Sequence, residues 1–200
     1  MPEVGAAAAR LRARNLRTLA LLAGLFLLPL VLAFCTYYGS SWRPPGSVNH
    51  GVLVSPPRAM PAASLAPLAG PEAPGALLRG RWSLVYLGGG ECGPECARAL
   101  AVMRDARLAL NQDVHRVAPV YLARSPCCSA EFLAAYPALE VRDARSADAA
   151  ALLAAFPEPD ADTLYVVDPL GNLMMRYDAR ANSRGLLEDL QKLLRLSHIG

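Results

Sequence analysis

The chain has little of what several classes of protein require. Of its 200 residues, 18% are charged, 6% are aromatic and only three are histidines. No Ser-His-Asp or metalloprotease pattern occurs, and the glycine run at residues 88–90 lacks the Lys-Ser/Thr ending of a phosphate-binding loop. Those hydrolase and nucleotide-binding classes are therefore excluded. The chain is nevertheless 54% hydrophobic, which also excludes a largely disordered protein.

Charge is scarce and unevenly distributed. The formal net charge of +3 hides seven arginines against two glutamates in residues 1–80. Residues 81–200 carry 13 basic and 15 acidic side chains. This second part has no basic excess with which to track phosphates, so we expect no nucleic-acid partner.

An apolar run of 21 residues without a charge extends over positions 18–38. As a helix it spans roughly 32 Å, about the thickness of the hydrocarbon layer, which predicts a transmembrane helix. Four arginines lie just before the run, and only Arg43 follows closely. This arginine bias predicts a cytoplasmic basic tail at residues 1–17 and a periplasmic location for everything after the helix. The membrane that the helix spans is then expected to be the inner membrane.

A cleaved signal peptide and a lipoprotein signal are the alternatives to an uncleaved anchor. The length of the run and the lack of a small-x-small cleavage site after it favour the anchor. Cys35 is then a small apolar residue within the bilayer.

Residues 39–80 hold eight of the 17 prolines and show no sustained helical or strand period. This composition predicts a periplasmic linker. A short apolar piece at 51–54 is a candidate edge strand or docking segment. His50, just before it, is expected to be an ordinary exposed histidine, with a ligand role as the alternative.

Residues 81–200 alternate strand-like and helix-like patterns and are predicted to form one domain. The sequence WSLVYL at 82–87 is typical of a buried strand, and turn residues at 168–172 separate the two strands of a hairpin. Serines 129 and 183 are the expected helix caps. The expected elements are strands 82–87, 114–122, 163–167 and 173–177 and helices 97–110, 129–136, 148–156 and 183–196. Their order predicts an α/β fold, a three-layer α/β/α sandwich around a mixed sheet.

Cys92 and Cys96 stand where the first strand of this domain gives way to its first helix. At this spacing the two sulfurs can lie on one side of the helical turn, close enough to bridge or to hold a soft metal. The positive end of the helix favours a thiolate at Cys92, the form that acts as nucleophile and metal ligand. Thiol exchange, Cu(I) binding and a structural disulfide are all compatible with this pair.

The strand at 82–87, the glycine loop, the pair Cys92 and Cys96 and the following helix resemble the Sco/SenC family. The run LYVVDPLG at 164–171 resembles the strand and turn that follow the metal-binding histidine of that family. The resemblance covers roughly residues 80–196. It implies a thioredoxin-like fold at 81–200 and a membrane-anchored protein that assists the assembly of cytochrome c oxidase. It also implies copper as the metal, with Cys92 and Cys96 as ligands.

The family's third copper ligand has no counterpart in this chain. The family places a histidine about eight residues before the position of Asp168, where this sequence has Asp160. Carboxylates are harder ligands than Cu(I) prefers. His115 and His198 are expected to be unliganded surface residues. Copper would then be held by the two thiolates alone or with a ligand from a partner.

Cys127 and Cys128 follow the second predicted strand. A bond between these adjacent cysteines is possible but disfavoured on geometric grounds. One of the two is a candidate resolving thiol or third metal thiolate, since loops after parallel strands gather at one edge of a sheet. Packing or a separate redox fate is the alternative.

The leading hypothesis is a single-pass membrane protein that assists oxidase assembly through thiol–disulfide exchange or Cu(I) handling. Cys92 would attack or ligate first, and Cys96 would resolve the mixed disulfide. The expected partners are the lipid bilayer and oxidase subunits or other assembly factors. A non-catalytic interaction module and a general periplasmic thiol–disulfide oxidoreductase are the alternatives, so whether the protein is an enzyme stays open.

Overall fold

The computed structural model describes residues 3–39, 49–71, 76–89, 91–197 and 199. The chain divides into two compact units, residues 1–47 and 48–200, which are described separately. Arg43 and His198, for which the sequence gives expectations, lie outside the described residues.

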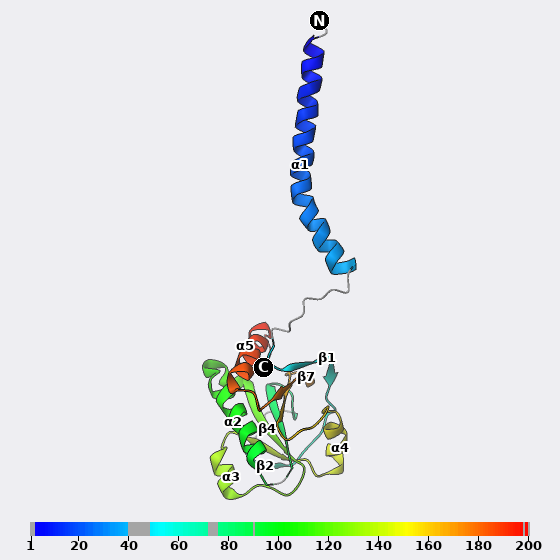
Figure 1. Cartoon of the computed structure of the whole chain (residues 1–200). Coiled ribbons are helices and arrows are strands. Elements are labelled where there is room, and N and C mark those ends of the chain that lie inside the picture. The colour runs from blue at the N-terminus through cyan, green and yellow to red at the C-terminus, as the bar shows by residue number, and fades with distance from the viewer. Residues whose placement is uncertain (1–2, 40–48, 72–75, 90, 198, 200) are drawn as a thin grey trace. The chain divides into compact units, whose positions relative to one another are not determined.

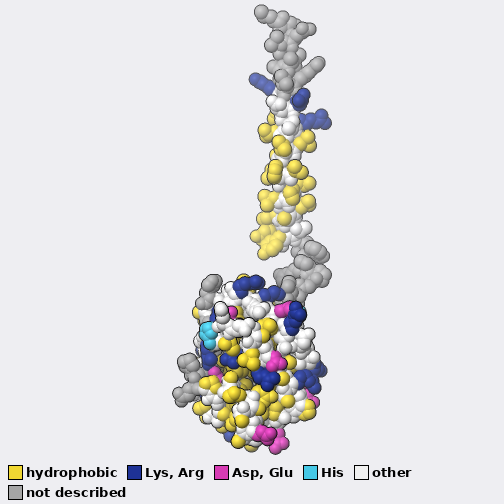
Figure 2. Space-filling model, turned by 90° about the vertical axis from the view of Figure 1, so that its left-hand side faces the viewer, with side chains coloured by type: hydrophobic (Ala, Val, Ile, Leu, Met, Phe, Trp, Pro, Cys, Tyr) yellow, Lys and Arg dark blue, Asp and Glu magenta, His cyan; other side chains and the backbone are white. Residues whose placement is uncertain are grey.

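The first unit is a single helix, α1, over Glu3–Gly39. Its segment Arg14–Gly39 is long and apolar enough to cross a membrane, and it contains the predicted span 18–38. Figure 2 shows hydrophobic side chains along this segment, with arginines gathered at one end. Cys35 is exposed on this helix and is not in a disulfide. An all-round apolar and unburied surface is what a lipid-facing helix requires.

The second unit is a seven-stranded mixed sheet with helices on both faces (Figure 1). The strand order is β1-β7-β6-β3-β4-β5-β2, in which the pairs β3–β4 and β4–β5 are parallel. The strands are β1 (Val52–Ala59), β2 (Pro67–Ala69), β3 (Trp82–Gly88), β4 (Val117–Ala123), β5 (Glu140–Asp143), β6 (Thr163–Val167) and β7 (Asn172–Asp178). The helices are α2 (Pro94–Leu108), the 3₁₀ helix η1 (Asn111–Arg116), α3 (Ala130–Ala135), α4 (Ala147–Ala154) and α5 (Ser183–Leu196). The predicted fold class is confirmed.

The two faces of the sheet have separate cores, and β3 contributes to both. Leu84 and Tyr86 pack with α2 and α5 on one face, whereas Val85 and Leu87 pack with α4 on the other. All seven residues of β3 and all seven of β4 are buried. This explains why the strand at 82–87 is a continuous apolar run instead of an alternating one.

The domain begins earlier than the expected boundary at residue 81. Strand β1 pairs with β7 and strand β2 with β5, so these two strands form the edges of the sheet. Met60, Leu65 and Leu78 are buried in the α4-side core. The expected linker 39–80 is therefore, over much of its described part, an integral piece of the domain. Prolines make these strands hard to predict from the sequence. An edge strand tolerates proline because the N–H groups on its outer side make no hydrogen bond to another strand.

Two further differences concern the middle of the domain. The strand expected at 114–122 starts only at Val117, because residues 111–116 form η1. Strand β5 is not expected from the sequence at all, since three of its four residues are charged. Its Glu140 is buried and forms ion pairs with Arg81 at 2.6 Å and Arg142 at 3.3 Å. These ion pairs allow a charged segment to occupy a place in the sheet.

The helix caps are partly as expected. Ser129 caps α3, since its hydroxyl accepts a hydrogen bond from the Phe132 N–H at 3.1 Å. Helix α5 is capped by Asn182 and not by the expected Ser183, because the Asn182 side chain accepts from the Gly185 N–H at 3.1 Å. Asn and Ser are equally good caps, so the sequence alone does not separate the two positions.

Gly88 ends β3 beneath the ring of Tyr121, where a Cβ atom would overlap the phenol. We expect Gly88→Ala to lower the free energy of unfolding by about 2 kcal/mol, because the buried ring has to shift. Urea unfolding of the full chain measures this change. Gly89→Ala is the matched control, since its Cβ would meet nothing closer than an Arg124 nitrogen at 3.7 Å. Equal stability of the two variants would contradict the packing described.

Candidate redox site at the start of helix α2

The structure brings Cys92 and Cys96 together in a disulfide, with their Cα atoms 5.2 Å apart. Cys92 lies in the loop after β3, and Cys96 lies in the first turn of α2. Gly93 caps the helix without a side-chain hydrogen bond and Pro94 is its first residue. The first N–H groups of α2 have no carbonyl partner within the helix, and they lie at the end of the helix that carries the two cysteines.

The two sulfurs differ in exposure. Cys96 is only 7% exposed and packs in the core with Ala99 and Leu100. Cys92 is half-buried and lines an open groove of about 650 Å³. A partner that approaches the disulfide from the groove meets Cys92 first.

The same groove is lined by Cys127 and Cys128, which are bonded to each other. The expectation that a bond between these neighbours is disfavoured is therefore wrong. Their Cα atoms are 3.2 Å apart, which brings the adjacent side chains close enough to bond. Glu91 and Phe132 also line the groove, so its wall is part carboxylate and part apolar.

Strand pairing explains why the two cysteine loops meet. Strands β3 and β4 are parallel and in register, with Gly88 opposite Ala123, so both loops leave the same edge of the sheet. The Arg124 N–H donates to the Gly88 carbonyl at 2.9 Å and extends the ladder by one bond. The predicted gathering of the loops is confirmed.

On its other side the disulfide borders a smaller pocket of about 260 Å³, lined by Cys96, Tyr86, Arg124 and Ala161 among others. The Tyr86 hydroxyl donates to the Ala161 carbonyl at 2.9 Å. Burial, followed by the nearby Tyr121 and Asp162, raises the pKa of Tyr86 to about 12. The phenol is therefore neutral at physiological pH and remains a hydrogen-bond donor.

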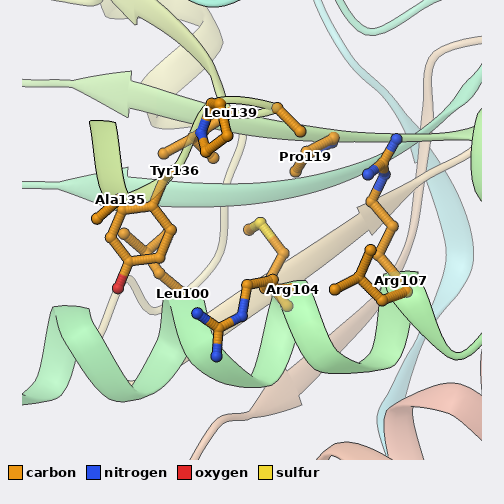
Figure 3. A pocket seen from close by; sticks show the side chains of 11 residues that line it. Leu100, Arg104, Arg107, Pro119, Ala135, Tyr136 and Leu139 are labelled. Atoms are coloured by element: carbon orange, nitrogen blue, oxygen red, sulfur yellow. The ribbon is translucent and has the colours of Figure 1, made fainter. Parts of the chain in front are cut away.

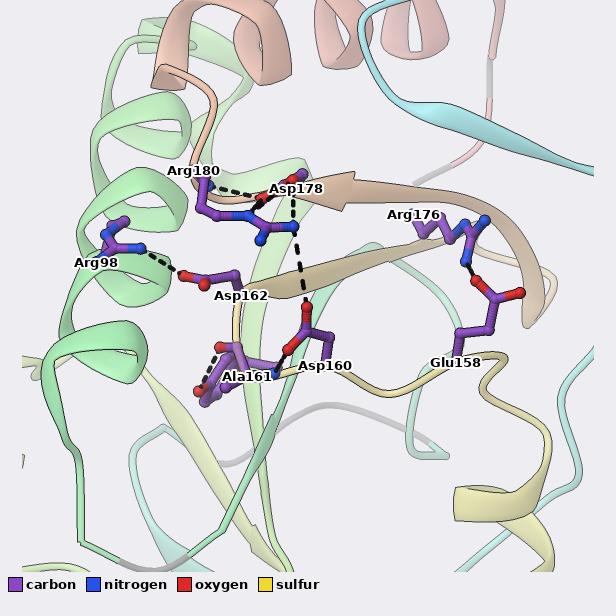
Figure 4. Close-up of polar contacts among 9 residues, drawn as sticks. Arg98, Glu158, Asp160, Ala161, Asp162, Arg176, Asp178 and Arg180 are labelled. Atoms are coloured by element: carbon purple, nitrogen blue, oxygen red, sulfur yellow. Dashed lines mark hydrogen bonds and ion pairs between the residues drawn. The ribbon is translucent and has the colours of Figure 1, made fainter.

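The acidic loop 157–162 occupies the place where the resemblance implies a histidine. Figure 4 shows its carboxylates turned toward arginines. Asp162, which is 8% exposed, pairs with Arg98 of α2 at 3.0 Å, and Asp160 lies 3.9 Å from Arg180. Glu158 pairs with Arg176 of β7.

The turn after β7 adds to this network. Hydrogen bonds from Arg180 hold the pKa of Asp178 below its ordinary range. The loop that would supply the family's third copper ligand is thus fixed by ion pairs.

The side chains do not fit a three-ligand copper site. Within the described ranges, no group of three or more His, Cys, Asp and Glu side chains is placed to hold a metal ion. His50 is an exposed residue that pairs with Glu188 at 2.9 Å. His115 is exposed in η1, before β4, at the sheet edge opposite the cysteines. Reduction of Cys92 and Cys96 would leave two thiolates as the soft donors.

An apolar pocket of about 160 Å³ lies beside α2 (Figure 3). It is lined by Leu100, Met103, Pro119, Tyr136 and Leu139 among others. Ala135 lines both this pocket and the cysteine groove, so the two hollows adjoin at the end of α3.

The sequence pattern assigns no site role to three residues that border the disulfide: Tyr86, Arg124 and Ala161. For Tyr86 it predicts only a place in the core, yet the hydroxyl reaches the pocket wall. Their positions relative to the strands are the signal that could have identified them. Tyr86 lies near the end of β3, Arg124 directly follows β4, and Ala161 precedes β6.

Solved structures share this fold at low sequence identity. Copper-bound ScoI of Bradyrhizobium japonicum is 18% identical, with a TM-score of 0.51, over 67% of this chain and 98% of that one. Copper-bound yeast Sco1 is 14% identical, with a TM-score of 0.57, over 70% and 94%. A DsbF homologue from Corynebacterium diphtheriae is 12% identical, with a TM-score of 0.51, over 76% and 98%. These likenesses establish the thioredoxin-like fold, which is common to copper-binding Sco proteins and a DsbF homologue.

A comparison with curated protein sequences found no match. The family model described as transmembrane-like, thioredoxin-like, C-terminal domain matches residues 82–197, which is more than half of the chain. The matched segment runs from β3 through α5 and includes both cysteine pairs. The chain therefore belongs to this family of transmembrane-like, thioredoxin-like C-terminal domains.

Proposed function

We propose that the protein is a membrane-anchored thiol–disulfide exchange protein whose reactive pair is Cys92 and Cys96. One observation carries the proposal: the pair is bonded at the start of α2, with Cys92 open to a groove and Cys96 buried. A pair that served only as a staple would not need one sulfur in an open groove. The unequal exposure instead divides the two steps of exchange between the two sulfurs.

In the reduced protein, the Cys92 thiolate attacks one sulfur of a client disulfide and releases the other client sulfur as a thiolate, which takes up a proton. Cys96 then attacks the Cys92 sulfur, so the Cys92–Cys96 bond forms and the second client sulfur is released. Two electrons pass from the protein to the client. The positive end of α2 stabilises the attacking thiolate, while Glu91 and Glu95 beside the pair oppose this effect.

The proposed setting is the outer face of an inner membrane. Helix α1 supports an anchor, and the arginines before its apolar segment favour a cytoplasmic N-terminus and a periplasmic domain. The resemblance to Sco proteins and the shared fold support a role in the assembly of cytochrome c oxidase. Its clients would be cysteine pairs in oxidase subunits or in other assembly factors.

Two rivals differ from this proposal in defined ways. A general periplasmic oxidoreductase would use the same chemistry on many clients. A non-catalytic interaction module would keep the Cys92–Cys96 bond as a permanent staple, and its reduction would loosen the domain.

Cys92 is the attacking sulfur in this proposal. We expect Cys92→Ser in the reduced full chain to slow reduction of a disulfide-bonded client peptide by at least about a hundredfold, because the attacking thiolate is lost. The domain should keep its circular dichroism spectrum. Cys35→Ser is the matched control, since Cys35 lies on α1 and outside the domain.

Unchanged exchange in Cys92→Ser would refute the assigned role of this sulfur. Loss of the fold together with exchange would favour the staple.

Cu(I) handling is the second candidate, favoured by the copper-bound relatives and by the two soft thiolates that reduction would provide. Copper would in that case be cargo that the protein passes on. The arginine-paired Asp160 lines neither pocket beside the disulfide, whereas Ala161 lines the pocket that contains Cys96. A third ligand is thus most easily added at Ala161.

We expect Ala161→His to strengthen Cu(I) binding by the reduced full chain at least about tenfold, because imidazole joins the thiolates. Asp160→His is the matched control and should change little. Anaerobic competition with a chromophoric chelator measures both variants, and Cys92→Ser/Cys96→Ser should abolish binding. Equal affinities for wild type and Ala161→His would contradict this geometry.

A further inference from the structure

Two disulfides line one groove. Cys92–Cys96 and Cys127–Cys128 come from different loops, yet Cys92, Cys127 and Cys128 all line this groove. All four cysteines of the domain are in these two bonds. Thiol exchange by the first pair alone leaves the second pair without a role.

The relative position of the two pairs is set by regular structure on both sides. The in-register pairing of β3 with β4 fixes the start of both loops, and the hydrogen bond from Arg124 N–H to Gly88 ties them. Cys92 leads directly into α2, and Cys128 leads into α3, which Ser129 caps. The loops therefore hold the pairs beside each other without any help from a partner.

The two sulfurs of the first pair differ in whether they share the groove with the second pair. Cys92, Cys127 and Cys128 are half-buried and pack on the α2-side core from the groove. Cys96 is buried and does not line the groove. A thiolate at Cys92 is thus the one that meets the Cys127–Cys128 bond.

We propose that Cys127–Cys128 is a second redox pair that exchanges electrons with Cys92 and Cys96 inside this groove. The Cys92 thiolate attacks a sulfur of the Cys127–Cys128 bond, which breaks that bond and forms a mixed disulfide. The released thiolate takes up a proton. Cys96 then attacks the Cys92 sulfur, reforms Cys92–Cys96 and leaves Cys127 and Cys128 as thiols. Two electrons move from the first pair to the second.

This inference rests on the proposed exchange function of Cys92 and extends it. The exchange is reversible, so the Cys127 and Cys128 thiols can return two electrons to the Cys92–Cys96 bond after the first pair has reduced a client disulfide, and the Cys127–Cys128 bond then reforms. The groove carries the exchange because Cys92, Cys127 and Cys128 all line it.

A trapping variant tests the relay. In Cys96→Ser, with Cys35→Ala to remove the thiol on α1, the Cys92 thiolate has no resolving partner. It should remain bonded to Cys127 or Cys128. Trypsin cuts after Arg81, Arg98, Arg124 and Arg142, so Cys92 falls in fragment 82–98 and the second pair in fragment 125–142. Non-reducing mass spectrometry of the full chain should find these two fragments disulfide-linked in most of the protein.

Cys92→Ser with Cys35→Ala, and with Cys96 retained, is the matched control. Its only free sulfur in fragment 82–98 is the buried Cys96, and the two fragments should separate. Cys96→Ala serves as a second trap if the serine variant does not fold. Unlinked fragments in a folded trapping variant, with Cys92 as the free thiol, overturn the relay.

Failure of the relay is distinguishable from failure of the proposed function. The variant Cys127→Ser/Cys128→Ser keeps the first pair and should still reduce a disulfide-bonded client peptide when supplied as the dithiol. Client exchange by this variant, together with no trapped link in Cys96→Ser, removes the relay alone. A trapped link in Cys96→Ser without client exchange by the double variant supports the relay and removes the proposed function.

Discussion

The parallel pairing of β3 with β4 is the constraint on which the site depends. Both strands are buried on both faces, so their register cannot slip without moving apolar side chains out of two cores at once. This fixed register delivers the loop with Cys92 and the loop with Cys127 to one edge of the sheet. The glycine at the end of β3 completes the arrangement, since Tyr121 fills the space that a side chain would need. The groove lined by the cysteines is thus a consequence of how the central strands pack.

The acidic loop before β6 separates this chain from the copper chemistry of the proteins that it resembles. Its carboxylates form ion pairs with arginines of α2, of β7 and of the turn after β7, and the most buried of these pairs, Asp162 with Arg98, ties the loop to α2. Tyr86 adds a hydrogen bond from beneath, with a phenol that stays protonated because it is buried. A loop fixed in this way can shape the pocket beside Cys96, but it adds no soft donor to the two sulfurs. The chemistry that we propose for this site is therefore that of the two thiols.

Much of the fold follows from local sequence patterns. The run at 82–87 predicts β3, the turn at 168–172 predicts the β6–β7 hairpin, and the helical pattern at 183–196 predicts α5, because each pattern is typical of one kind of regular structure. The edge strands β1 and β2 are not predicted in full because their prolines are tolerated only where tertiary context leaves an N–H unpaired. Strand β5 escapes prediction because its charges are satisfied by partners distant in sequence, such as Arg81.

The candidate site, like the fold, is predicted only in part by the sequence. The spacing of Cys92 and Cys96 at a strand–helix junction identifies the first pair. The sequence does not reveal the bond between Cys127 and Cys128, or the approach of Ala161 to Cys96, because both depend on how loops are held by the rest of the domain.

The central claim is that the Cys92–Cys96 bond opens and closes while the domain stays folded. The most direct measurement is near-ultraviolet circular dichroism of the full chain as dithiothreitol reduces this bond, with Cys127→Ala/Cys128→Ala to isolate the pair and alkylation to count its thiols. The account predicts an unchanged spectrum on reduction and faster alkylation of the accessible Cys92 than of the buried Cys96. Loss of the spectrum in step with reduction would contradict it and identify the bond as a structural staple.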